Sequence, residues 1–416
     1  MASIKPFCGI RPTQEKASAV AALPYDVMNS EEARQMVVGK PDSFLHVDKA
    51  EIDLDPAISP YDDRVYQKAK ENLEKMISSH VLLQDEKPMF YIYRLKMGEQ
   101  VQTGLVACTS IDEYLNETIK KHELTRADKE EDRIRHVDTL NANTGPIFLA
   151  YREKEEIRNI LKRWMEEHPA IYDFVAEDGV EHSAWKIEDA DVISALVAQF
   201  QQVPNLYIAD GHHRNASAVK VGLKRREQNP NYTGEEEFNY YLAVLFSADD
   251  LYIMDYNRLV KDLNGHTPQE FLQKVAEKFE IIPCTDDKSC SPKKLHQFGM
   301  YLEGKWYLLC AKEEIISKDA VESLDVSILQ KSLLEPILAI GDPRTDQRID
   351  FVGGIRGLKE LERRVDNGEM AVAFSMYPTS MEELMAVADS GRTMPPKSTW
   401  FEPKLRSGLF IHSLEG

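Results

Sequence analysis

The residues best suited to chemistry form the segment 210–214, Asp-Gly-His-His-Arg, between the mostly apolar run 203–209 and the helix-like stretch 215–219. A strand that stops at a glycine and then enters a helix predicts a phosphate-binding corner. The glycine permits a tight turn, and the first turn of the helix offers unpaired N–H groups to an anion. Arg214 adds a guanidinium fork that fits phosphate, and adjacent histidines suit proton transfer or metal ligation. The alternative is structural, with histidines that cap the helix and with Arg214 paired to Asp210 or another acid to hold the turn. We favour function, because such groups at a strand-to-helix junction are typical of α/β sites.

A second group of charged residues spans 121–133 and contains His122, Glu123, Arg126 and Arg133. On a helix, the adjacent His122 and Glu123 would point about 100° apart, so they could not face one ligand as the His-Glu-x-x-His motif of zinc proteases does. The two arginines are candidates for phosphate binding, and Glu123 for a general base or a magnesium ligand. On spacing alone, a solvated charged helix is the favoured interpretation.

Two further segments carry polar groups that could meet a ligand. Lys397 stands beside Ser398 and Thr399, a combination that could bind phosphate. The loop 141–146 offers two amides and a glycine, either to a polar ligand or to its own turn. The sequence contains no GxxxxGK[ST] motif, which excludes a Walker-type kinase.

The elements that must position these residues alternate between helical and strand patterns, which predicts a mixed α/β fold. Apolar residues recur at helical spacing over 62–79 and 190–200. The runs 90–95 and 101–109 predict a hairpin, and 240–246 predicts a further strand.

At 416 residues, the chain is long enough for two to three domains, each with its own core. We expect four parts: an N-terminal α/β part at 1–150, a core with the 210–214 segment at 151–262, a smaller lobe or insertion at 263–335, and a C-terminal segment at 336–416 that packs back on the core.

Charge and hydropathy limit the classes of partner. The net charge of −19 argues against broad capture of nucleic acid, which needs clustered Lys and Arg. No run approaches the ~18 apolar residues of a membrane span, and residues 1–13 lack the apolar core of a signal peptide. We therefore expect a cytoplasmic protein without a membrane partner.

Six short motifs, read in order, resemble one known family, the bacterial and archaeal set labelled domain of unknown function 1015. The resemblance spans nearly the whole chain, and the motifs are specific as a set although none is specific alone. They are IRP at 10–12, PYDV at 24–27, HELT at 122–125, GPIF at 145–148, DGHHR at 210–214 and MPPKSTWFEPK at 394–404.

The DGHHR box followed by a helix is also similar to the phosphate-binding box of the ParB and sulfiredoxin superfamily, which includes nucleotide-binding partition proteins and free-serine kinases. This resemblance implies a ParB/sulfiredoxin-like nucleotide-binding core with additional α/β lobes. It also implies that Gly211, His212, His213 and Arg214 bind phosphate, with Asp210 near the metal or the acceptor. This chain is much longer than those relatives, and a shared box need not mean a shared reaction.

The expected function is transfer of a phosphoryl group from ATP or ADP, with Mg²⁺, to a small hydroxyl-bearing metabolite, free serine being the first candidate. Such chemistry needs phosphate clamps, magnesium and one positioned base. The segment 211–214 would clamp phosphate, with Arg126 as a further contact, and Asp210 would bind magnesium. Glu123 or His122 would deprotonate the hydroxyl.

Two alternative functions fit the same residues. One is a nucleotide sensor without catalysis, which would be stabilised by nucleotide without consuming it. The other is a metal-dependent hydrolase that uses His122, His212 and His213 and binds zinc or manganese. A DNA-binding role is the least expected, given the acidic balance and the lack of a basic helix.

Overall fold

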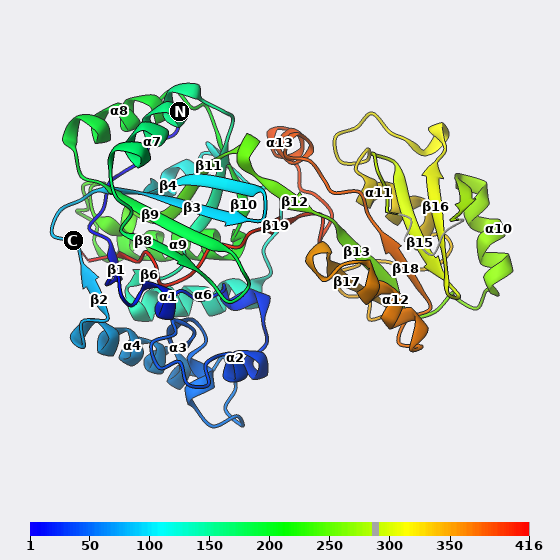
Figure 1. Cartoon of the computed structure of the whole chain (residues 1–416), viewed down its shortest axis with the longest axis horizontal. Coiled ribbons are helices and arrows are strands. Elements are labelled where there is room, and N and C mark those ends of the chain that lie inside the picture. The colour runs from blue at the N-terminus through cyan, green and yellow to red at the C-terminus, as the bar shows by residue number, and fades with distance from the viewer. Residues whose placement is uncertain (285–290, 416) are drawn as a thin grey trace. The chain divides into compact units, whose positions relative to one another are not determined.

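The computed structural model describes residues 1–284 and 291–415, and the chain divides into two compact units (Figure 1). Unit 1 comprises Met1–Leu251 together with Pro403–Gly416, and unit 2 comprises Tyr252–Glu402. Both combine helices with sheets, so the predicted mixed α/β fold is confirmed. The boundaries between the two units fall after residues 251 and 402. The four parts expected from the sequence have other boundaries, and that division stays a prediction.

An eight-stranded mixed sheet forms the centre of unit 1. Strands β5 and β10 pair in parallel, as do β7 and β11, whereas the other neighbours are antiparallel. In spatial order the strands are β5 (Ile119–Lys120), β10 (Leu206–Asp210), β7 (Ile147–Tyr151), β11 (Tyr240–Ser247), β4 (Gln100–Ser110), β3 (Phe90–Met97), β9 (Glu181–Ile187) and β8 (Tyr172–Val175).

The apolar patterns explain this sheet. Strand β11 is a nearly continuous apolar run and is buried over most of its length, as expected for a central strand covered on both faces. Helices α7 (Glu155–Glu167) and α8 (Ala190–Phe200) pack on the sheet (Figure 1). The helical side chains in this shared core are Ile157, Leu161, Leu196 and Phe200.

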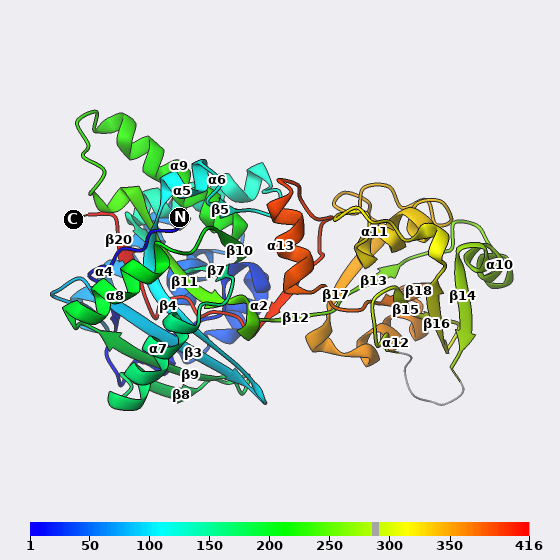
Figure 2. The same cartoon turned by 90° about the horizontal axis from the view of Figure 1, so that it is seen from above.

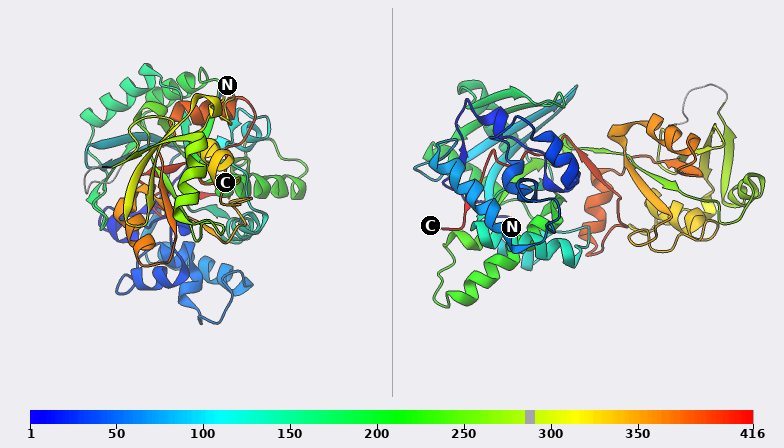
Figure 3. Two further views of the ribbon diagram at one scale, coloured as in Figure 1. Left: turned by 90° about the vertical axis from the view of Figure 1, so that its right-hand side faces the viewer. Right: turned by 90° about the horizontal axis from the view of Figure 1, so that it is seen from below.

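Helices near the N-terminus form a further layer of unit 1, drawn in blue in the two views of Figure 3. This layer contains α1 (Ala17–Val20), α2 (Ser30–Met36), α3 (Leu45–Asp48) and α4 (Asp63–Ser78). Helix α4 buries Val65, Ala69, Leu73 and Met76, the face that its apolar spacing predicts. It packs beside α6 (Ala127–Leu140), which in turn packs against α9 (His212–Gln228). A short helix, α5 (Ile111–Leu115), follows β4.

The C-terminal segment 403–416 returns to unit 1 and joins short strands there. Strand β20 (His412–Ser413), labelled beside the C-terminus in Figure 2, pairs with β6 (Ala142–Asn143). Strand β1 (Ile10–Pro12) pairs with β2 (Leu82–Gln84). Leu409, Phe410 and Ile411 are fully buried. This segment is therefore part of the core of unit 1.

Unit 2 contains a six-stranded antiparallel sheet. Its strands, in spatial order, are β14 (Phe279–Pro283), β16 (Lys305–Ala311), β15 (Gln297–Leu302), β18 (Val372–Ser375), β13 (Tyr256–Val260) and β17 (Ile349–Gly353). Its helices are α10 (Pro268–Lys278), α11 (Asp325–Leu329), α12 (Leu358–Asp366) and α13 (Met381–Asp389). A separate ribbon pairs β12 (Tyr252–Met254) with β19 (Trp400–Glu402). Within the part of the chain that the structure describes, no helix has the length and apolar character needed to cross a membrane.

Candidate functional site

Two loops that the sequence analysis singled out meet at one edge of the sheet in unit 1. Strands β5 and β10 are parallel neighbours, so their carboxyl ends lie side by side. Strand β5 continues into residues 121–126, here called the HELT loop, and β10 continues into Gly211. The two constellations, distant in sequence, therefore contribute to one site.

Gly211 makes the turn from β10 into α9 in a left-handed conformation, with φ at +90°. A Cβ atom at this position would lie 3.1 Å from Nε of Arg214, so the arginine packs directly over the glycine. Arg214 Nη1 donates a hydrogen bond to the carbonyl oxygen of Pro146 at 2.6 Å. Its Nε is buried and has no hydrogen-bond partner among the described residues. The glycine thus gives Arg214 the space to lie across the start of α9, where a bound anion would also be held.

Asp210 ends β10 with both carboxylate oxygens engaged. Oδ1 accepts a hydrogen bond from the Gly211 N–H at 2.8 Å, and Oδ2 accepts one from Nζ of Lys404 at 3.0 Å. Burial alone would raise the pKa of Asp210, but the charges of Lys404 and Arg214 outweigh it and lower that pKa. Asp210 is therefore an ionised carboxylate. Each of its oxygens has a further lone pair for a cation, so the predicted magnesium ligand is compatible with this geometry.

Lys404 contacts Asp210 in this site, but it was not among the site residues predicted from the sequence. It closes the MPPKSTWFEPK motif, from which only Lys397 was selected as a phosphate ligand. Lys397 lies in unit 2, where its Nζ is 5.5 Å from the ring centroid of Tyr256 and its carbonyl oxygen accepts a hydrogen bond from Arg258. A phosphate contact by Lys397 stays a prediction.

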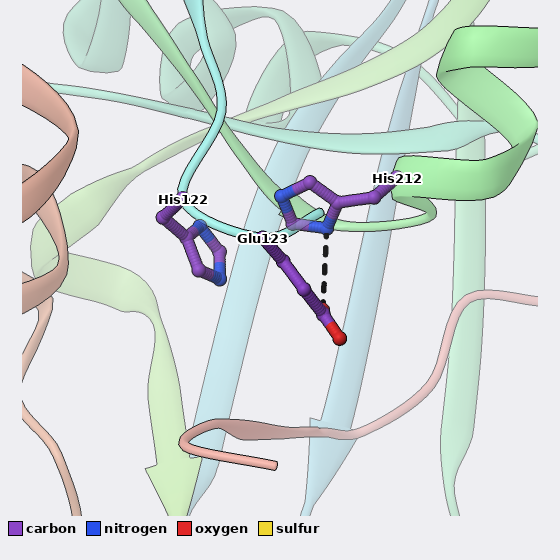
Figure 4. Close-up of side chains that lie close together, drawn as sticks. All are labelled: His122, Glu123 and His212. Carbon is purple, nitrogen blue, oxygen red and sulfur yellow. Dashed lines mark ion pairs between the residues drawn. The ribbon is translucent and has the colours of Figure 1, made fainter. Parts of the chain in front are cut away.

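His122, Glu123 and His212 gather beside the start of α9 (Figure 4). Oε2 of Glu123 is 3.7 Å from Nδ1 of His212, and the two imidazole rings meet edge to face with centroids 4.5 Å apart. We call these three residues the histidine cluster. The sequence predicted that His122 and Glu123 would point apart, because it placed both residues on a helix. That prediction of a helix at 122–123 is wrong. The HELT loop is not helical, because α6 begins only at Ala127, so adjacent side chains can converge.

Both histidines of this cluster are neutral because they are buried. Burial lowers the pKa of His122 to about 4, against smaller opposing effects of the Ile208 backbone and the Asp210 charge. Burial also lowers the pKa of His212 well below its ordinary value, and nearby His122 lowers it further. A neutral imidazole can accept a proton or ligate a metal ion.

His213 and Arg126 are held by other contacts. Nε2 of His213 accepts a hydrogen bond from the backbone N–H of Arg126 at 3.0 Å. The guanidinium of Arg126 pairs with Asp128 at 2.9 Å and is 65% exposed. The structure therefore groups Glu123, rather than His213, with His122 and His212.

Arg214 also lines a small cavity of about 30 Å³. Arg133 lies in its wall, paired with Asp132 at 2.9 Å, and its guanidinium is 4.1 Å from the ring centroid of Tyr25. Thr144 donates a hydrogen bond to Oδ1 of Asp48 at 2.9 Å. Polar residues of the wall come from the PYDV motif, α3, α6, the loop 141–146 and α9, and include Tyr25, Asp48, Arg133, His136, Thr144 and Arg214. The PYDV motif and the loop 141–146 thus meet the DGHHR motif here.

The chain matches several solved structures at low sequence identity, and no curated protein matches it. A free serine kinase in complex with AMP is 14% identical, with a TM-score of 0.37; the match covers 74% of this chain and 91% of that one. A conserved hypothetical protein from Pyrococcus furiosus is 16% identical, with a TM-score of 0.36 and coverage of 74% and 95%. C-terminally truncated SbnI from Staphylococcus aureus is 11% identical, with a TM-score of 0.38 and coverage of 73% and 85%. At these TM-scores the likeness assigns no activity.

The family comparison is more decisive, because one family model matches residues 4–327. That range contains five of the six motifs and the whole histidine cluster. By this match the chain belongs to the family described as "Protein of unknown function (DUF1015)".

Proposed function

We propose that this protein binds ATP or ADP through its phosphates at the Gly211–Arg214 corner and transfers a phosphoryl group to a small hydroxyl-bearing metabolite. The proposal is carried by the position of Arg214, which packs over Gly211 at the start of α9 and also lines the small cavity. An arginine with a buried, unpartnered Nε at a helix N-terminus fits a phosphate oxygen. Free serine is the first acceptor to test, because the box resembles that of free-serine kinases.

The residues divide the work between phosphate and acceptor. Arg214 and the N–H groups of the first turn of α9 hold the phosphate and neutralise the charge that develops on its oxygens. Lys404 supplies a second cation beside Asp210. Mg²⁺ bound with the nucleotide would supply further charge neutralisation, with Asp210 as its protein ligand.

Glu123 is the proposed base of the transfer. Its side chain is 41% exposed and projects from the HELT loop, so an acceptor hydroxyl can reach the carboxylate. The acceptor oxygen forms a bond to the terminal phosphorus as the bond from phosphorus to the leaving nucleotide breaks, and the hydroxyl proton passes to Glu123.

A thermal-shift and turnover experiment tests this proposal. With ATP or ADP and Mg²⁺ at about 100 times the dissociation constant, the fold should gain about 2.7 kcal/mol of stability. Arg214→Ala should abolish that gain, whereas Arg163→Ala, an exposed arginine in the same unit, should preserve it. Nucleotide consumption that requires serine supports phosphoryl transfer. If nucleotide stabilises the protein but is not consumed with any hydroxyl acceptor, the result would instead support a nucleotide sensor. If nucleotide neither stabilises the protein nor is consumed, both the phosphotransferase and the sensor hypotheses are contradicted.

A further inference from the structure

The histidine cluster has the composition of a metal site. His122 and Glu123 come from the HELT loop and His212 from the first position of α9, and their side chains converge from these two segments (Figure 4). One ligand atom from each residue can be chosen so that all three lie within 4.8 Å of one another. Among the residues that the structure describes, this is the one group of three or more potential ligands so arranged.

The cluster also contains buried polar atoms whose hydrogen-bonding capacity is unmet. His122 is 2% exposed, and among the described residues neither of its ring nitrogens has a hydrogen-bond partner of normal geometry. His212 is 6% exposed, and its Nε2 likewise lacks a partner in the described part of the chain. Buried polar groups in folded proteins are almost always satisfied, so these two rings call for a bound species, which can take one nitrogen of each. The edge-to-face contact of the rings does not satisfy them.

We propose that His122, Glu123 and His212 bind a divalent transition-metal ion, with Zn²⁺ as the representative species. Two imidazoles and one carboxylate suit zinc and its neighbours, whereas magnesium prefers oxygen ligands alone. Tetrahedral zinc with bonds of ~2.0–2.1 Å places its ligand atoms roughly 3.4 Å apart. The 3.7 Å between Glu123 Oε2 and His212 Nδ1 is close to that spacing.

Three protein ligands leave a fourth position for water or for a ligand oxygen. The negative charge of Asp210 acts on His122 and would also stabilise a cation here. This inference goes beyond the proposed phosphoryl transfer and does not depend on it. If the ion is bound, Glu123 is its ligand in the resting protein rather than a base.

The test is metal binding by the full chain without nucleotide. Chelator-treated protein is titrated with Co²⁺, whose visible absorption reports a four-coordinate site with nitrogen ligands, and elemental analysis measures Zn²⁺ after dialysis. We expect a single ion per chain, with Zn²⁺ displacing Co²⁺. Loss of an outer-shell partner typically costs 10–100-fold in metal affinity, so loss of a ligand in His212→Ala or His122→Ala should weaken binding by at least ~100-fold.

Two further variants keep the test decisive if a buried histidine cannot be replaced without unfolding. Glu123→Gln alters a partly exposed side chain, should keep the fold, and should still weaken binding by at least tenfold. His213→Ala is the matched control, because that histidine is adjacent in sequence but has its Nε2 bonded to Arg126, so binding should be unchanged. No stoichiometric Co²⁺ or Zn²⁺ in the wild type, or equal binding by Glu123→Gln and the wild type, would overturn the proposal.

Discussion

At the scale of single residues, the site depends on a glycine that gives an arginine room. Gly211 adopts φ of +90°, and Arg214 lies so close that a methyl group on the glycine would contact its guanidinium. Two separate effects therefore oppose any side chain at 211. One is backbone strain in the left-handed region, and the other is displacement of Arg214.

A comparison of two glycines separates these effects. Gly179 also has a positive φ, of +79°, but a Cβ there would meet open space. We expect Gly179→Ala to lower the free energy of unfolding by about 1 kcal/mol through strain alone. Gly211→Ala should cost about 1–3 kcal/mol and also weaken nucleotide binding. Urea unfolding and nucleotide titration of both variants measure this, and equal nucleotide affinity in the two would show that Arg214 does not need the glycine.

At the scale of elements, the parallel pairing of β5 with β10 brings the HELT loop to the DGHHR corner. The sequence predicted β10 and the helix after it from an apolar run, a glycine and helical spacing. It could not predict the pairing, because β5 is only two residues long and leaves almost no periodic signal. It also placed His122 in a helix, since charge density there resembles a solvated helical face. The loop that actually forms is what allows the histidine cluster.

The start of helix α2 is a feature that the local sequence is enough to indicate. The run Asn29-Ser30-Glu31-Glu32 has the pattern of a helix start, and in the structure it forms a capping box. Asn29 Oδ1 accepts a hydrogen bond from the Glu32 N–H at 2.9 Å, and Glu32 accepts one from the Asn29 N–H at 2.8 Å. Asn29→Ala should therefore destabilise unit 1 by about 1 kcal/mol, whereas Asn29→Asp, which keeps the acceptor, should be nearly neutral. Chemical denaturation measures both. Equal stability of the alanine and aspartate variants would mean that packing alone maintains α2.

At the scale of the whole molecule, unit 1 buries several histidines that make it sensitive to acid. Burial lowers the pKa of His136 to about 4, with the charge of Arg133 adding to the effect. Burial, with the charge of Arg406, lowers the pKa of His182 to about 3. In the unfolded chain each of them titrates near 6.5. Between about pH 6.5 and 4, the unfolded state therefore binds more protons than the folded state.

This difference in bound protons decides how the free energy of unfolding changes with pH. The free energy of unfolding should fall as the pH drops from 6.5 towards 4, by up to about 1.4 kcal/mol per pH unit for each such histidine. The lowered pKa of Asp210 contributes below that window, because its stabilisation is lost only under more acidic conditions. Urea midpoints at pH 7 and 5.5 at constant ionic strength measure the slope. His136→Gln, which keeps a donor for the Val47 carbonyl, should flatten it, and midpoints that do not change with pH would refute the prediction.

The return of residues 403–416 to unit 1 has a consequence for the order of events during synthesis. Unit 2 is continuous in the chain, so it can fold as soon as it has left the ribosome, whereas unit 1 must wait for its last segment. Until then Asp210 has no Lys404, and β6 has no β20. A nascent chain halted before residue 403 would therefore expose apolar surface that Leu409, Phe410 and Ile411 normally cover, which makes it a natural client for chaperones.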